Sequence, residues 1–251
     1  MATSGFSASD RGWRRSVSPR IAGDYDGDGK ADPAVYTAAT GTWKIWLSGS
    51  GYSPLVLSPL LGGPGFVPAS ADFDGDGKCD PAVYAEATGQ WIVLMSGSGY
   101  ARLAFPRLLG APGWSPCPAD FDGDGKADPA VYAEGVGTWK VLMSGSGYAA
   151  LQLAALLGGV GQGPCPADFD GDGKADPAVY AESTGGWLMM LSRSGYGRVS
   201  HPGWLGGWGY APLPADFDGD GKADPAVYKA ATGEWRVRLS GSGYAEIRVT
   251  L

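Results

Sequence analysis

The clearest hydrophobic pattern in the chain is a five-residue alternation that occurs five times. The segments read WKIWL from Trp43, WIVLM from Trp91, WKVLM from Trp139, WLMML from Trp187 and WRVRL from Trp235. The first, third and fifth positions are always large and apolar, whereas the second and fourth vary from lysine to leucine. Apolar residues at every second position are typical of a strand with one buried face. The pattern therefore predicts five equivalent β-strands, each with one buried and one free face.

Each of these segments lies inside a repeat of 48 residues. The repeats start at residues 24, 72, 120, 168 and 216, without insertion or deletion, and residues 72–119 and 120–167 are identical at 34 of 48 positions. A fixed period of this size indicates a repeat architecture. Five equal units without a linker favour one closed body over two separate domains.

Three further strands are predicted in every unit. The first is a proline-led segment such as 115–121, the second is a segment such as 80–86, and the fourth follows an SGSGY hairpin, as at 52–57. A glycine-rich link, such as 60–68, leads to the next unit. Four antiparallel strands in about 40–50 residues are typical of a propeller blade. We therefore predict an all-β fold, a five-bladed β-propeller of four-stranded antiparallel blades.

The beginning of the chain does not follow the repeat. Residues 1–17 align poorly with any unit, so we treat them as an extension and a candidate closing strand, with residues 18–251 as a single propeller domain. This extension has no apolar core of the kind that a signal peptide carries. No apolar run in the chain reaches the ~18 residues of a membrane-spanning helix.

An acidic loop recurs between the first and second predicted strands. Its first copy, DYDGDGKADPAV from Asp24, has carboxylates at positions 1, 3, 5 and 9, glycine at 6 and lysine at 7. These are the first nine positions of an EF-hand calcium loop, in which position 7 contributes its backbone carbonyl. Position 12 is valine and the flanks are strands, so this is no EF-hand, and the aspartate at position 9 must close the shell.

Five copies at one spacing favour calcium over a solvated acidic turn, and magnesium fits less well because it demands octahedral geometry. We expect about five Ca²⁺ per chain, which would change the net charge from −7 to about +3. The predicted ligands are the four aspartates of each loop and the lysine carbonyl: Asp24, Asp26, Asp28, Lys30 and Asp32; Asp72, Asp74, Asp76, Lys78 and Asp80; Asp120, Asp122, Asp124, Lys126 and Asp128; Asp168, Asp170, Asp172, Lys174 and Asp176; Asp216, Asp218, Asp220, Lys222 and Asp224.

The combination of DFDGDGKADPAVY, a Thr-Gly turn before tryptophan and SGSGY resembles the FG-GAP/VCBS repeats of bacterial surface and secreted proteins. The acidic loops are also similar to those in the propeller of integrin α chains. The resemblance covers residues 24–251, although the Phe-Gly/Gly-Ala-Pro signature is degenerate and the best-known members have seven blades. It implies one calcium ion per blade, a secreted or cell-surface location and a role in adhesion or recognition. Fungal lectins with similar propellers bind sugars between blades, which suggests carbohydrate as a ligand.

The topology predicts two unlike ends. The acidic loops and SGSGY hairpins share one end of the propeller, and the Thr-Gly turns and links share the other. The links vary most, and their candidate ligand-binding residues are Phe66, Trp114, Gln162, Trp208 and Tyr210. Loops on a rigid scaffold commonly carry function. These residues either bind a ligand, such as carbohydrate or another cell-surface protein, or fill the seams between blades.

Other chemistry finds little support in the sequence. The chain has one histidine, His201, at a position that is otherwise apolar, and no Ser-His-Asp set, so we expect no enzyme. A calcium-dependent polysaccharide lyase remains a minor alternative, and a purely structural or engineered symmetric scaffold is a second one. Glu86, Glu134 and Glu182 are predicted to be blade-edge charges. The three cysteines are predicted to be small buried residues without a disulfide. No basic stripe with aromatics occurs, which argues against nucleic acid as a partner.

Overall fold

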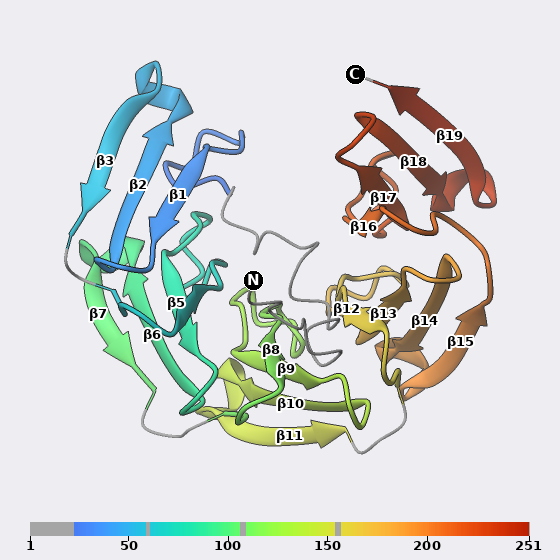
Figure 1. The fold of residues 1–251 in the computed structure, drawn as a ribbon, viewed down its shortest axis with the longest axis horizontal. Coiled ribbons are helices and arrows are strands. Elements are labelled where there is room, and N and C mark those ends of the chain that lie inside the picture. The colour runs from blue at the N-terminus through green and yellow to red at the C-terminus, as the bar shows by residue number, and fades with distance from the viewer. Residues whose placement is uncertain (1–22, 59–60, 106–108, 154–156, 251) are drawn as a thin grey trace, which may run out of the picture.

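The protein forms five antiparallel sheets that stand as blades around a central axis (Figure 1). This computed structural model describes residues 23–58, 61–105, 109–153 and 157–250. The predicted closing strand within residues 1–17 lies outside the described residues. The predicted five-bladed β-propeller is confirmed.

Blades 2 to 5 each have four described strands in the same order, and blade 1 has three. Blade 1 has β1 (Ala34–Thr37), β2 (Thr42–Leu47) and β3 (Ser53–Leu57). Blade 2 has β4 (Phe66–Pro68), β5 (Ala82–Ala85), β6 (Gln90–Met95) and β7 (Ala101–Ala104). Blade 3 has β8 (Trp114–Pro116), β9 (Ala130–Ala133), β10 (Thr138–Met143) and β11 (Ala149–Leu153). Blade 4 has β12 (Gln162–Pro164), β13 (Ala178–Ala181), β14 (Gly186–Leu191) and β15 (Gly197–His201). Blade 5 has β16 (Ala211–Pro212), β17 (Ala226–Lys229), β18 (Glu234–Leu239) and β19 (Ala245–Thr250).

A short 3₁₀ turn, such as Ser48–Ser50, joins the third and fourth strands of each blade. The glycine after it and the following tyrosine both take positive φ, 68° at Gly51 and 63° at Tyr52. The same two-residue conformation occurs in all five SGSGY or SRSGY hairpins. A strained tyrosine at one fixed place indicates that the turn geometry is imposed by its surroundings.

Where it is described, the first strand of a blade is shorter than predicted. In blade 3 it covers Trp114–Pro116 rather than extending to residue 121. Beyond it the Cys117 N–H still donates to the Ala130 carbonyl at 2.9 Å, but Pro118 has no N–H to donate, and an isolated bridge, Ala119 to Asp128, follows. The end of the predicted link is therefore a strand, and Phe66, Trp114 and Gln162 each begin one.

The prediction of one free face per central strand is wrong for the inner blades. Ile92 and Leu94, on the side expected to be free, are 2% and 1% exposed. Each inner sheet is covered on both sides, because it stands between two neighbouring blades. Single-sheet periodicity could not reveal this second partner.

The hydrophobic core is divided among the seams between blades. One core joins Phe73, Tyr84 and Trp91 of blade 2 to Val131 and Leu142 of blade 3. Within it the Phe73 and Trp91 rings meet edge to face with centroids 6.1 Å apart. The same arrangement recurs at the other seams between consecutive blades. The seams therefore supply the apolar burial that holds the blades in register.

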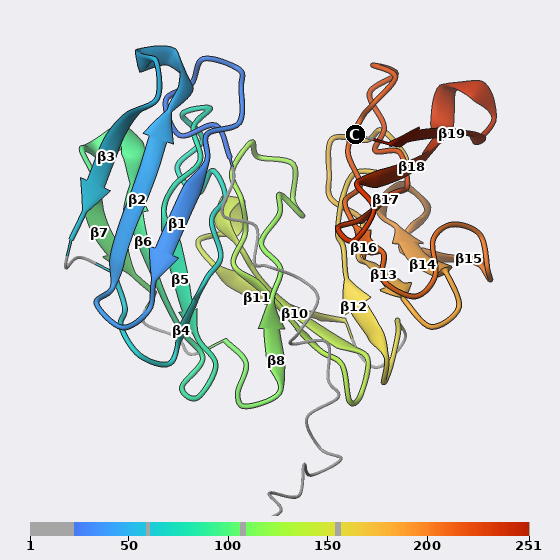
Figure 2. The same cartoon turned by 45° about the horizontal axis from the view of Figure 1, so that its top comes forward.

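The ring of blades is open on one side. Blade 1 and blade 5 stand at the two ends of the arc, and both views show them apart (Figures 1 and 2). The part of the chain that the structure describes has no helix that is long and apolar enough to cross a membrane.

Candidate metal centre

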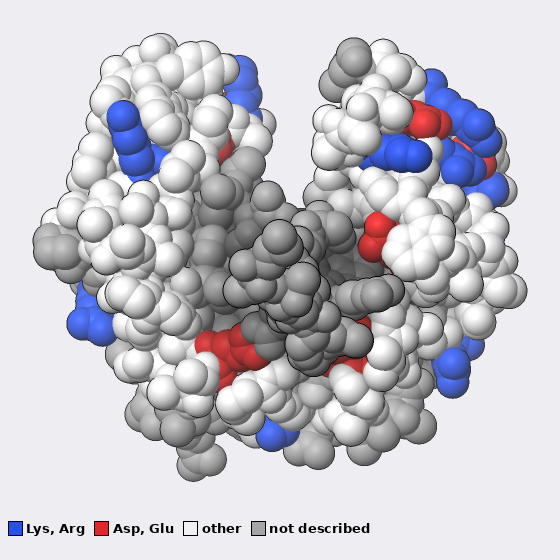
Figure 3. Space-filling view, viewed as in Figure 1, with Lys and Arg blue, Asp and Glu red and all other residues white. Residues whose placement is uncertain are grey.

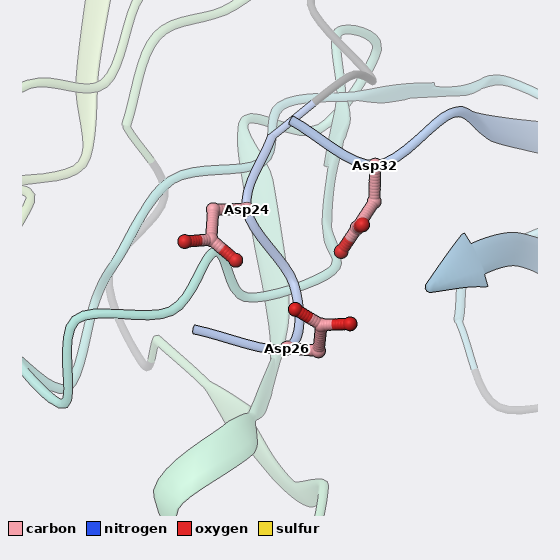
Figure 4. Close-up of side chains that lie close together, drawn as sticks. All are labelled: Asp24, Asp26 and Asp32. Atoms are coloured by element: carbon pink, nitrogen blue, oxygen red, sulfur yellow. The ribbon is translucent and has the colours of Figure 1, made fainter. Parts of the chain in front are cut away.

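Three carboxylates converge at the loop end of every blade. In blade 1 the side chains of Asp24, Asp26 and Asp32 face a common point (Figure 4). In each blade one oxygen from each of three aspartates lies within 4.8 Å of the other two. The five triads occupy positions 1, 3 and 9: Asp24, Asp26 and Asp32; Asp72, Asp74 and Asp80; Asp120, Asp122 and Asp128; Asp168, Asp170 and Asp176; Asp216, Asp218 and Asp224.

Backbone N–H groups of the loop fix the first aspartate. In blade 1 the N–H groups of Gly27 and Gly29 donate to the two oxygens of Asp24, at 2.6 and 2.7 Å. Both glycines have positive φ, 80° and 84°, which other residues adopt only with strain. The glycines at positions 4 and 6 therefore allow the loop to wrap around its own first carboxylate.

The ninth aspartate ties the loop to the neighbouring hairpin. Asp80 is fully buried and accepts hydrogen bonds from the N–H groups of Phe73 at 2.8 Å and Ser96 at 2.7 Å. Burial still raises its pKa to about 6, and it does the same for Asp128 and Asp176. The ionised form is therefore costly in the absence of a cation.

Position 5 does not belong to the triad. Its carboxylate turns to the hairpin, where Asp76 accepts a hydrogen bond from the Ser96 hydroxyl at 3.0 Å, and it also accepts the N–H of Lys78 at 2.9 Å. Of the predicted side-chain ligands, the structure thus brings together those at positions 1, 3 and 9. The position 5 carboxylate holds the loop against the hairpin.

The lysine at position 7 has a contact beyond the backbone carbonyl that the sequence predicted as a ligand. Its aliphatic stem crosses the seam, and the Lys78 Cγ and Cε lie 3.3 and 3.1 Å from the place where a Cβ on Gly27 would stand. The glycine at position 4 therefore also makes room for the lysine of the next blade.

The hairpin residues are part of the site, although the sequence analysis did not select them. The N–H of Gly97 donates to the Asp74 carboxylate at 3.0 Å. A Cβ at Gly97 would stand 3.0 Å from Asp74 Oδ2, so a side chain there crowds the triad. The signal that could have found these residues is the constant distance of SGSGY from the acidic loop in every repeat.

Blade 4 departs from this plan because Arg193 replaces the hairpin glycine. Its guanidinium donates to the carbonyl of Gly171 at 2.8 Å, and its N–H donates to Asp170 Oδ2 at 3.1 Å. Asp170 Oδ1 is buried and has no hydrogen-bond partner within the described residues. The hairpin of blade 4 therefore adds an arginine charge that is hydrogen-bonded to its acidic loop.

At the opposite end, the candidate ligand-binding residues have unequal surroundings. Phe66, Trp114 and Tyr210 are half-buried and pack against the cores of adjoining seams. Gln162 is also half-buried, whereas Trp208 is 71% exposed. Their predicted role in ligand binding remains a prediction.

Glu86, Glu134 and Glu182 are more than edge charges. Each accepts a hydrogen bond from a glycine N–H in the following link, at 2.7, 2.6 and 2.7 Å respectively. They hold the links in place, which explains why this glutamate recurs.

His201 and the cysteines have packing environments. His201 stacks on Trp204 with ring centroids 3.9 Å apart, and burial lowers the pKa of its imidazole. None of the three cysteines forms a disulfide within the described residues; Cys117 and Cys165 are buried as predicted, whereas Cys79 is only partly buried.

The repeat also matches a known sequence family. The model of the FG-GAP-like repeat matches residues 72–131, from the acidic loop of blade 2 to the second strand of blade 3. No curated protein matches the chain. The 48-residue period extends the matched features to the other blades, so the protein is a five-bladed β-propeller that carries an FG-GAP-like repeat and five acidic clusters that could hold metal ions.

Proposed function

We propose that the five acidic loops bind Ca²⁺ and that the protein is an extracellular recognition module whose ligand is carbohydrate. The donor set supports calcium. Each triad offers only hard carboxylate oxygens, and the loop positions its first aspartate through its own backbone, as calcium loops do. With no ion present, three carboxylates within 4.8 Å repel one another.

The observation that carries the recognition role is the link between blades 4 and 5. Trp208 exposes 71% of its surface there, and its indole ring offers a large apolar face. Nearby in the same link, the Tyr210 hydroxyl donates to Glu234 at 2.7 Å, and the Lys229 ammonium lies 5.2 Å from the Tyr210 ring centroid. An exposed aromatic face beside charged hydrogen-bonding groups suits a sugar ring, which has apolar C–H faces and polar hydroxyls.

The neighbouring link provides a matched comparison. Val160 occupies the position equivalent to Trp208 and is 84% exposed, and the position equivalent to Glu234 is Gly186. The aromatic and charged groups are thus combined in the last link and not in the one before it. This difference is expected of a selected surface and is not required for packing.

A glycan array with the calcium-loaded protein tests the proposal. Trp208→Ala should lower binding of the best glycan at least ~10-fold while the melting temperature stays within about 1 °C. Val160→Ala should change neither quantity. Binding to no glycan, or undiminished binding by Trp208→Ala, would favour the alternative of a purely structural scaffold.

The lyase alternative has no specific support in the described residues. The single histidine stacks on Trp204 and lies in the outer strand β15, away from the acidic loops in sequence. We therefore propose a binding module without catalytic activity.

A further inference from the structure

The opening between blade 1 and blade 5 exposes two faces whose equivalents in the other blades are buried. At every seam between consecutive blades, the valine at position 12 of the acidic loop packs against the preceding blade. Val83, Val131, Val179 and Val227 are at most 1% exposed, whereas Val35 is 48% exposed. Tyr52 is 58% exposed, but its equivalent Tyr100 packs against the core between blades 1 and 2. Blade 1 therefore presents the face that a preceding blade would cover.

Blade 5 presents the complementary face. Val249, in its outer strand, is 49% exposed, whereas the equivalent residues Leu57 and Phe105 are 7% and 5% exposed. Phe217 is 45% exposed, whereas Phe73 and Phe121 are each 1% exposed. Within the described residues, nothing covers these side chains.

The polar contacts of a seam are incomplete at the same place. At four seams the N–H at position 8 of one loop donates to the carbonyl at position 1 of the preceding loop. Each bond is 2.6 Å long: Cys79 to Asp24, Ala127 to Asp72, Ala175 to Asp120 and Ala223 to Asp168. No such bond joins Ala31 to Asp216 in the described part of the chain.

The contact between the loop lysine and the glycine at position 4 is also absent between blade 5 and blade 1 in the described residues. A Cβ at Gly27, Gly75, Gly123 or Gly171 would meet the lysine of the next loop, whereas nothing lies within 4 Å of that position at Gly219. Lys30, which would fill it, is instead paired with Asp28 of its own loop at 3.2 Å. Blade 1 and blade 5, at the two ends of the arc, therefore each carry one uncovered half of a seam.

We propose that these two end faces bind each other between copies of the protein, so that blade 5 of one copy docks head to tail on blade 1 of a second copy. The four formed seams have the same bonds and contacts, so they repeat one packing geometry. Closing the gap within one chain would require a change in this repeated geometry. A second copy supplies the missing half, because it carries the same blade 1 face. Figure 3 shows the opening as a slot between the two end blades.

The interface is heterologous, since the two faces differ, and it leaves one free face at each end of a dimer. Association should therefore continue beyond the dimer as concentration rises. Sedimentation velocity of the 25.8 kDa protein in calcium, over about 1–200 μM, should show a mass that grows steadily with concentration.

Two single substitutions make the test specific. Val35→Asp damages only the blade 1 face and Val249→Asp damages only the blade 5 face; both positions are about half exposed, so the blades should still fold. Each variant alone should be monomeric. Their mixture should give a 1:1 dimer and nothing larger, because one intact face remains on each. Val136→Asp, at a position 62% exposed on a turn, is the control and should associate like the unmodified protein.

A protein that stays monomeric throughout the concentration range would overturn the proposal, and so would a mixture that remains monomeric. Association of either single variant to the same extent as the unmodified protein would also overturn it, because the interface would then lie elsewhere.

Discussion

The two ends of the propeller differ in how much the blades resemble one another. At the loop end, all five blades place three aspartates at the same spacing and hold them with the same backbone hydrogen bonds. At the link end, equivalent positions carry phenylalanine, tryptophan, glutamine and tyrosine. Uniformity at one end and variety at the other fit the two tasks proposed above, metal binding at the loops and ligand binding at the links.

Among the tests of this difference between the two ends, removal of metal from the loop end should have the largest effect on stability. If each of five sites is filled at 100-fold its dissociation constant, each stabilises the folded protein by about 2.7 kcal/mol relative to an unfolded chain that does not bind. We therefore expect EDTA to lower the melting temperature by well over 10 °C and elemental analysis to give about five calcium ions per chain. A metal-loaded protein with one ion, or a melting curve indifferent to EDTA, would contradict the calcium proposal.

The metal-free protein should also respond to pH in a defined direction. Burial raises the pKa values of Asp80, Asp128 and Asp176 to about 6, above the ordinary aspartate value near 3.9. The folded state then binds more protons than the unfolded state between these values, so stability falls as pH rises from about 4 to 7. Urea denaturation in EDTA should show this decrease. In saturating calcium it should vanish or reverse, because the ion stabilises the ionised carboxylates.

Loss of a single loop should have a smaller and local effect. Asp122→Ala removes one member of the blade 3 triad, so the protein should bind four calcium ions and lose about 2–3 kcal/mol in saturating calcium. Trp208→Ala, at the other end, is the control and should retain five ions. Loss of most of the calcium on Asp122→Ala would show that the five loops bind as one unit.

At the link end, two tryptophans should respond differently. Trp114 is half-buried and packs against the core between blades 2 and 3, so Trp114→Ala should cost about 1–3 kcal/mol of unfolding free energy. Trp208 is 71% exposed, so its truncation should cost less than about 0.5 kcal/mol. Equal costs in urea denaturation would mean that the two residues share one role.

The smallest expected effect lies within the loop end itself. The guanidinium of Arg193 is bonded to the blade 4 loop and adds a positive charge beside its triad. Arg193→Gly restores the hairpin residue of the other blades, so it should tighten one of five calcium sites by about 3- to 10-fold, or about 0.7–1.4 kcal/mol. Calcium titration by calorimetry, with Ser146→Ala as a control in another hairpin, measures this. An unchanged titration would show that the charge of Arg193 does not affect the calcium affinity of the blade 4 site.

Much of this architecture could be predicted from the sequence because the repeat is nearly exact. The period gave the blade count, and the spacing of aspartates gave the three members of each triad together with the position 5 aspartate, which lies outside the triad. Contacts between repeats could not be obtained in the same way. The stem of Lys78 against Gly27 and the burial of Ile92 depend on how one blade stands against the next, which no pattern within a single repeat encodes.

The roles of individual residues were harder to predict from the sequence than the fold was. Trp114 and Trp208 both lie in links between blades, yet one packs in a seam and the other is exposed. Sequence gave no means to separate them, because an aromatic side chain is equally suited to both places. The Asp28 carboxylate, which was also predicted as a ligand, is hydrogen-bonded to Ser48, a residue 20 positions away, and its role as a ligand remains a prediction.

The backbone hydrogen bonds across the seams turn the five acidic loops into a connected row. Each interior loop is bonded to the loop before it and the loop after it, whereas those that begin at Asp24 and Asp216 have one such neighbour in the described chain. Elements that interact only with their neighbours behave as a one-dimensional lattice, in which the ends open first. Calcium ions should therefore dissociate from the loops of blades 1 and 5 before they dissociate from the loops of the middle blades. Time-resolved chelation would then show at least two release phases, the faster from the two ends.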